Sequence, residues 1–297
     1  MRYHLAAIFT VIVWGTTMVS TKVLLNEGLS PVEIMLIRFI TAYFVMWMLY
    51  PKWQREFSIS EELVFLGLGI TSGSLYFIFE NTALIYTTAT NVSLICALIP
   101  LMAAFLIYLI YMDKPLSKWF YIGSAVSVAG AALVVLNGNF TLHISPLGDA
   151  LAFLSICSWA LYCVLVRLLK GSYNTLFVTR KIFFYSILTL MPYIIYVEPY
   201  EVSMETLCKP VVFLNLAFLG IIASSICYFL WTLSLRQLGV NKTNNYVYFT
   251  PLITILTAHI VLQEQVTIYV ICGTALILCG LAIARKEIKN TDYDTKI

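Results

Sequence analysis

Apolar residues occur along this chain in ten long runs, each separated from the next by a short polar segment. Each run is close to the about 20 residues that an α-helix needs to cross a bilayer. The pattern therefore predicts an all-α protein with ten transmembrane helices. Their expected ranges are Leu5–Leu25, Val32–Leu49, Leu63–Ile85, Asn91–Tyr111, Trp119–Leu136, Leu147–Leu169, Leu176–Val197, Val211–Leu235, Thr243–Leu262 and Ile268–Ala284.

The composition supports this class. Of the 297 residues, 61% are hydrophobic and 11% are charged, whereas a soluble domain has about 45–50% apolar and about 25% charged residues. A globular core could not bury so many apolar side chains and still leave a wettable surface. We therefore expect an integral membrane protein whose main partner is the lipid bilayer, and we exclude a soluble enzyme, a nucleic-acid-binding protein and a disordered scaffold.

The basic residues predict the orientation. An even number of spans places both termini on one side, and 15 of the 18 lysines and arginines fall on that side. The exceptions are Lys22, Arg38 and Lys209. Because cytoplasmic loops carry the excess of positive charge, we expect both termini to be cytoplasmic.

Several sequence features recur about 150 residues apart. They are the glycine pairs Gly123/Gly130 and Gly273/Gly280, the prolines Pro100 and Pro251 with an acid 13 residues later (Asp113 and Glu264), and Trp14 and Trp159 with a basic residue eight positions later. We therefore divide the chain into two repeats, residues 1–143 and 144–297, with five helices each.

The repeats have a mechanistic consequence. Because each contains an odd number of spans, the second must enter the membrane from the opposite side to the first. Inverted repeats that meet near the bilayer midplane are typical of secondary transporters, since exchanging the conformations of two similar halves gives alternating access. The paired glycines allow close approach of two helices, so we expect the fifth and tenth helices to pack together.

The chain resembles a ten-helix transporter of the EamA-domain type, in the drug/metabolite transporter superfamily. The landmarks are Trp14-Gly15, Arg38, the stretch Ala83-Leu-x-Tyr86-Thr-x-Ala89 that leads to Pro100, and the two glycine pairs. The resemblance implies a carrier of the inner membrane, whose relatives export amino acids, other metabolites or drugs. One feature departs from the small four-helix relatives, because the first helix here lacks their proton-coupling glutamate.

We expect the solute to bind between the repeats, near the midplane. Tryptophan and tyrosine side chains far from the loops fit a membrane-interface belt poorly, and rings with a few polar groups suit an amphipathic solute. The candidate substrate-binding residues are Trp14, Thr17, Arg38, Tyr76, Glu80, Trp159, Tyr228, Asn244, Asn245 and Tyr248. Pro100 and Pro251 are candidate kinks for gating, because each removes a backbone hydrogen bond and frees a carbonyl that must find a partner or line a cavity.

Four ionisable residues stand out within the predicted spans, where charge is costly: Lys22, Arg38, Glu80 and His259. Arg38 and Glu80 are expected at similar depths, and we favour a structural ion pair between them; the alternative is that Arg38 binds an anionic group while Glu80 exchanges protons. We interpret Lys22 as extending to the interface, and His259 as an interior histidine with a hydrogen-bond partner rather than a proton relay.

The chain shows no catalytic, metal-binding or cofactor-binding motif. We therefore expect a monomeric secondary transporter for a small organic solute, such as an amino acid, another metabolite or a drug-like compound, and not an enzyme. Export is the expected direction, and protons are a candidate coupling ion. The alternative function is a passive channel or a structural membrane subunit.

Overall fold

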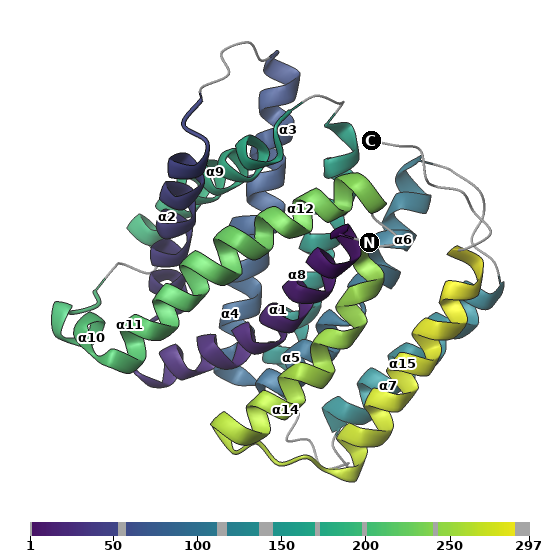
Figure 1. The fold of residues 1–297 in the computed structure, drawn as a ribbon. Helices are drawn as coiled ribbons and strands as arrows, with labels where there is room; N and C mark the ends of the chain where they lie inside the picture. The colour runs from purple at the N-terminus through teal and green to yellow at the C-terminus, as the bar shows by residue number, and fades with distance from the viewer. Residues whose placement is uncertain are drawn as a thin grey trace.

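The computed structural model describes residues 2–52, 58–111, 118–136, 145–169, 173–197, 201–239 and 243–288, and every regular element among them is helical (Figure 1). The first half contains α1 (Arg2–Asn26), α2 (Pro31–Leu49), α3 (Ile59–Gly69), η1 (Ile70–Ser74), α4 (Leu75–Tyr86), α5 (Ala89–Cys96), α6 (Ile99–Tyr111) and α7 (Lys118–Leu136). The second half contains α8 (Pro146–Leu165), η2 (Val166–Leu168), α9 (Thr175–Tyr196), α10 (Met204–Cys208), α11 (Pro210–Ala217), η3 (Phe218–Ile226), α12 (Cys227–Leu238), η4 (Asn245–Phe249), α14 (Thr250–Leu262) and α15 (Ile268–Ile288).

These elements form the ten predicted spans. Among the described residues, seven helical segments are long and apolar enough to cross a membrane, and three shorter apolar helices, at Lys118–Val134, Thr250–Leu262 and Ile268–Ile283, complete the set. Several large apolar side chains are more than half exposed, as expected for helices that face hydrocarbon: Phe44, Leu49, Phe213, Leu214 and Ile260. The prediction of an all-helical, ten-span membrane protein is confirmed.

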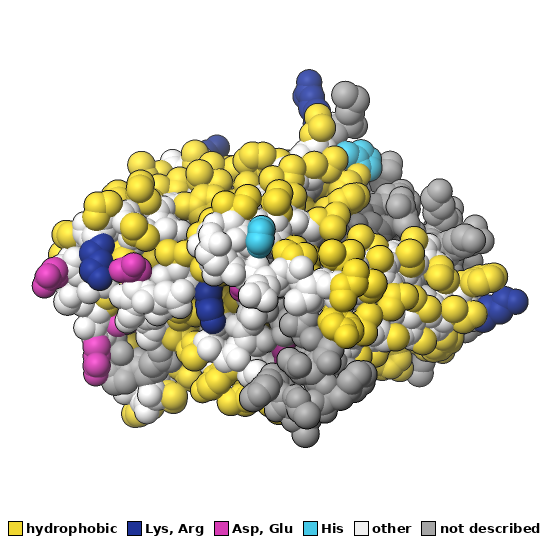
Figure 2. Space-filling model, turned by 90° about the horizontal axis from the view of Figure 1, so that it is seen from below, with side chains coloured by type: hydrophobic (Ala, Val, Ile, Leu, Met, Phe, Trp, Pro, Cys, Tyr) yellow, Lys and Arg dark blue, Asp and Glu magenta, His cyan; other side chains and the backbone are white. Residues whose placement is uncertain are grey.

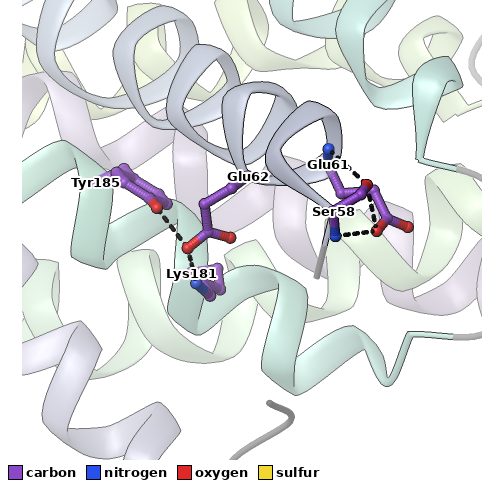
Figure 3. A network of polar contacts seen from close by, with 5 residues as sticks. All are labelled: Ser58, Glu61, Glu62, Lys181 and Tyr185. Atoms are coloured by element: carbon purple, nitrogen blue, oxygen red, sulfur yellow. Dashed lines mark hydrogen bonds and ion pairs between the residues drawn. The ribbon is translucent and has the colours of Figure 1, made fainter. Parts of the chain in front are cut away.

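Local sequence signals set where some helices begin. Ser58 precedes α3, and its hydroxyl accepts a hydrogen bond from the backbone N–H of Glu61, while the Glu61 carboxylate accepts one from the N–H of Ser58. This reciprocal capping satisfies backbone groups that the first turn leaves free. The next residue of α3 contacts another helix: Glu62 Oε1 accepts hydrogen bonds from Lys181 (2.5 Å) and Tyr185 (2.6 Å) on α9 (Figure 3). Charged groups thereby hold the start of α3 against α9.

Two spans are broken at their prolines rather than kinked. The fourth span divides into α5 and α6, and Pro100 is the second residue of α6. In the ninth span η4 precedes α14, and Pro251 is again the second residue of the helix. Proline is well tolerated in a first turn because its missing N–H would have no intrahelical partner there. The mid-helix kinks expected at Pro100 and Pro251 are thus interruptions between two helical pieces.

The third and eighth spans contain wide helical turns at corresponding places. η1 and η3 are both π-helical, and each contains small or polar residues: Thr71, Ser72, Gly73 and Ser74 in η1, and Gly220, Ser224 and Ser225 in η3. A π-turn shifts the backbone hydrogen bonds by one residue and is frequent at functional sites. Hydrophobic periodicity does not predict these turns.

α7 and α15 pack side by side along their length (Figure 1). A Cβ added at Gly273 would lie 2.7 Å from the carbonyl oxygen of Gly130 and 2.3 Å from a methyl group of Val134, so only glycine fits there. Ser127 Oγ also donates a hydrogen bond to the Ile277 carbonyl across the same contact (3.2 Å). The expected packing of the fifth helix on the tenth is confirmed.

We predict that Gly273→Val destabilises the protein by about 1–3 kcal/mol, because the added methyl groups overlap Val134 and the Gly130 backbone. The measurement is thermal unfolding of the purified chain in detergent. Ala275→Val is the control, because Ala275 is exposed on the same helix. Equal melting temperatures for the two variants would contradict the close α7–α15 contact.

Candidate functional site

A small cavity lies at the centre of the protein. It has a volume of about 50 Å³, well below the about 300–1,000 Å³ of typical ligand pockets. We call it the central cavity, and residues from both repeats line it: Trp14, Thr17, Met18, Arg38, Tyr76, Phe77, Glu80, Cys96, Ile99, Trp159, Tyr228, Val247 and Thr250. Seven of the predicted substrate-binding residues are in this set.

Aromatic rings form much of the cavity wall. The Trp14 and Trp159 ring centroids lie 5.7 Å apart in an edge-to-face arrangement, and Tyr76 lies 5.0 Å from Trp159. The fully buried Trp231 packs 5.0 Å from Trp14, and Tyr162 packs 5.1 Å from Trp159. A second set of buried rings therefore supports the aromatic wall of the cavity.

The two π-helical turns supply hydrogen-bond partners for the cavity side chains. Trp14 Nε1 donates to the Ala223 carbonyl of η3 (3.1 Å), and the Tyr228 hydroxyl donates to the Ser72 carbonyl of η1 (3.1 Å). The side chains are thus oriented by backbone groups of the opposite repeat. The sequence signal for this arrangement is the cluster of small polar residues within two otherwise apolar spans.

Both proline breaks open onto the central cavity. Cys96 and Val247 stand four residues before Pro100 and Pro251, and Ile99 and Thr250 stand one residue before them; all four line the cavity. Interrupted backbone at membrane depth is tolerated only where it is buried in protein or lines a cavity. The two equivalent interruptions meet at such a place.

Arg38 and Glu80 both line the cavity but do not bond to each other. The Arg38 Nε atom donates to the Ser224 hydroxyl (2.8 Å), and the Tyr76 hydroxyl donates to Glu80 Oε1 (2.5 Å). Among the described residues, no carboxylate lies within 4.0 Å of the Arg38 nitrogens. The favoured ion pair between Arg38 and Glu80 is therefore not formed, because each group has a different partner.

Of the other three predicted site residues, the structure describes the side chain of Asn244 alone. Asn244 is buried, donates to Cys163 Sγ (3.4 Å) and is not part of the lining. The side chains of Asn245 and Tyr248 lie outside the described part of the chain. Sequence spacing placed Asn244 close to Pro251, but the 3₁₀ turn of η4 lies between them and changes which way successive residues face.

A larger, open pocket lies beyond the central cavity and shares no lining residue with it. We call it the vestibule; its volume is about 780 Å³. Figure 2 shows the face onto which it opens, with polar and charged side chains in the middle and hydrophobic ones along the upper edge. Helix α1 lines both spaces: it contributes Thr17 and Met18 to the cavity and Lys22 and Asn26 to the vestibule.

Three charged side chains hold the turn between α4 and α5, which lines the vestibule. Lys22 donates to the carbonyls of Leu84 and Thr87 at the end of α4. Glu264, from the second repeat, accepts from the backbone N–H groups of Ala89 (2.9 Å) and Thr90 (3.2 Å) at the start of α5. A cation at a helix C-terminus and an anion at a helix N-terminus are both favourable.

The same turn has further contacts. Thr90 Oγ1 donates to Glu264 (2.6 Å), and Thr87 Oγ1 donates to Asp149 of α8 (3.3 Å). We call Lys22, Glu264 and Asp149 with the turn they hold the turn clamp; it joins both repeats at the vestibule. Lys22 thus binds carbonyls within the protein and does not simply extend to the interface. His259 is exposed and contacts the Glu264 carbonyl (2.9 Å), so it is not the interior histidine that the sequence suggested.

We predict that Glu264→Gln speeds hydrogen exchange at the backbone amides of Ala89 and Thr90 by about tenfold, because a charged acceptor is lost from the start of α5. Hydrogen–deuterium exchange with mass spectrometry measures this. Glu27→Gln is the matched control, since Glu27 also lines the vestibule but pairs with Lys209. The same exchange rates in both variants would show that Glu264 does not stabilise the turn.

The comparisons with known proteins agree with this architecture. The sequence pattern of the EamA-like transporter family matches residues 1–136 and again residues 146–285. An "Uncharacterized transporter" of Archaeoglobus fulgidus is 28% identical over 289 residues, which cover 94% of this chain and 96% of the relative. The "Uncharacterized transporter YyaM" of Bacillus subtilis is 27% identical and covers 71% of this chain and 69% of its own. A protein of known crystal structure superposes with a TM-score of 0.71 at 18% identity, over 96% of this chain and 98% of that one, which shows a shared fold.

Proposed function

Because the chain belongs to the EamA-like transporter family, we propose that it carries a small organic solute across the cytoplasmic membrane by alternating access to the central cavity. Membership of the family confirms the resemblance seen in the sequence, and it makes the protein a membrane transporter and not an enzyme. The single observation that carries the proposal is the small cavity lined by residues of both repeats, accompanied by a larger, open vestibule that shares no lining residue with it.

The small size of the cavity favours a carrier over a passive channel. A channel needs a continuous path, whereas this cavity holds only about 50 Å³, and the buried rings of Trp231 and Tyr162 pack against its Trp14 and Trp159. We call the packed rings of Trp231 and Tyr162 the aromatic end. In alternating access the turn clamp opens while the aromatic end stays closed, and the aromatic end opens while the turn clamp stays closed. The cavity must widen in each open state to admit a solute larger than a few waters.

Three further features belong to the proposal. The charge distribution supports cytoplasmic termini, which places the vestibule on the outer side. Export is the direction that the family resemblance implies. Residues of both repeats, 1–143 and 144–297, line the one cavity, so we propose that the working unit is a monomer.

Proton coupling through Glu80 is part of the proposal. The sequence alone favoured a structural pair with Arg38, but the two groups have separate partners. Glu80 also lines the cavity, so a proton and a solute can compete for the same space. A carboxyl group that is loaded and unloaded from alternate sides couples solute movement to protons.

We predict saturable, trans-stimulated release from proteoliposomes. Liposomes are loaded with a mixture of amino acids, organic acids and amines, and release is followed by mass spectrometry. A solute that the protein carries should leave faster when the same solute is present outside, and a pH gradient should drive it in the wild type but not in Glu80→Gln. Glu27→Gln, an acid-to-amide change outside the cavity, should keep the gradient effect.

Two results would contradict the proposal. Release that does not saturate and is unaffected by solute on the other side indicates a channel. Equal gradient-driven uptake by wild type and Glu80→Gln excludes Glu80 as the coupling group and leaves facilitated diffusion or exchange.

A further inference from the structure

We infer that the solute carries a carboxylate, which the Arg38 guanidinium binds, attached to an apolar body that lies among the rings of the central cavity. The inference rests on the proposed function, since it takes the central cavity as the solute site, and it specifies the chemical class of that solute.

The first observation is a buried cation with unused donors. The Arg38 side chain is 3% exposed, and its only hydrogen bond within the described chain is from Nε to Ser224. A guanidinium has five N–H donors, so the four on its two Nη atoms have no acceptor among the described residues. A buried charge without a full set of partners is costly, and an oxyanion entering the cavity satisfies it.

The second observation is that two neighbouring side chains fix the orientation of the Arg38 guanidinium. Phe77 lies under the guanidinium, 4.3 Å from its carbon to the ring centroid, and Ser224 fixes the Nε edge. The ends of the Nη groups thus remain free while the plane of the group is set. A fixed planar fork matches a carboxylate with two parallel hydrogen bonds. Ser224 is a positioning residue, which orients Arg38 from the π-helical turn of the opposite repeat.

The third observation concerns the rest of the cavity. Trp159 is 4% exposed, and its Nε1 atom is buried without a hydrogen-bond partner among the described residues. The rings of Trp14, Trp159 and Tyr228 pack against one another with centroid separations of 5.7–6.0 Å, and they offer apolar surface to the cavity. Such a wall binds an apolar or aromatic body, and the free indole N–H offers a further donor to a solute oxygen.

The distribution of these groups between the repeats supports one defined anion position. Several cavity positions are paired across the repeats, such as Tyr76 with Tyr228, 152 residues apart. Both charged residues of the lining, Arg38 and Glu80, come from the first repeat. A pseudo-symmetric wall with one cation on one side therefore binds the solute in a single orientation, carboxylate towards α2.

The experiment uses three probes of one shape. They are 3-phenylpropionate, its neutral amide 3-phenylpropionamide, and the cation 3-phenylpropylamine. Binding to the purified full chain in detergent is measured by the rise in melting temperature with probe concentration, which reports affinity for the folded state. We expect 3-phenylpropionate to bind at least about tenfold more tightly than the amide, and the amine to bind most weakly.

Variants connect the preference to Arg38. Arg38→Gln should remove the preference, so that carboxylate and amide bind equally, and Arg38→Lys should keep only part of it because an ammonium lacks the planar fork. Ser224→Ala leaves the charge in place and should weaken carboxylate binding more than amide binding, which also serves if Arg38→Gln fails to fold. Lys209→Gln is the control: it removes one positive charge at an exposed position and should change nothing.

Each other outcome overturns the inference. Equal binding of carboxylate and amide by the wild type, tighter binding of the amine, or binding of none of the probes would each show that Arg38 does not select a carboxylate on an apolar body. The proposed function is tested separately, because the release assay depends on no particular solute charge; saturable release of a cationic or neutral solute would reject this inference and keep the carrier.

Discussion

In hydrocarbon, every backbone N–H and C=O group must find its partner within the protein, because no water is there to replace it. Among the described residues, four spans depart from regular helix in their interior, at η1, η3 and the two breaks that precede Pro100 and Pro251, whereas the 3₁₀ turn η2 only ends the sixth span. These four departures lie at the interface of the two repeats and line one cavity or hold its side chains. The constraint explains why: irregular backbone is stable there only when it lines a protected space, so the position of the cavity and the positions of the irregular turns determine each other.

The duplication gives the central cavity a wall of equivalent parts from both repeats, but the charged residues of that wall come from one repeat only. Tyr76 and Tyr228 line the cavity from the third and eighth spans, and each π-helical turn offers a carbonyl to a ring across the interface. A carrier needs two half-channels of similar structure so that opening either end costs a similar free energy. It also needs to bind its cargo in one way. The pseudo-symmetric wall provides the similar half-channels. The charges of Arg38 and Glu80, present in one repeat only, provide the single binding orientation.

The sequence was sufficient for the architecture and for much of the cavity wall. Hydrophobic runs predict spans because the bilayer fixes their length, and Trp14 and Trp159 were recognisable as deep aromatic residues. It was not sufficient where the outcome depends on distances between helices. Lys22 looked like a residue that reaches for the interface, yet it binds the end of α4. Arg38 and Glu80 looked like partners, yet Arg38 donates a hydrogen bond to Ser224 and Glu80 accepts one from Tyr76. These contacts depend on helix rotation and on π-turns, which hydrophobic periodicity does not encode.

The central claim is that one cavity opens to either side in turn, and Cys96 provides a direct test because its side chain lines that cavity. In a variant that keeps Cys96 and replaces the other six cysteines, a membrane-impermeant maleimide is applied to right-side-out or inside-out vesicles, with and without Glu264→Gln. Our account predicts labelling from both sides, with Glu264→Gln raising the rate from the outside and lowering it from the inside, since opening the turn clamp closes the aromatic end. Labelling from one side only, or a rise on both sides together, would contradict alternating access.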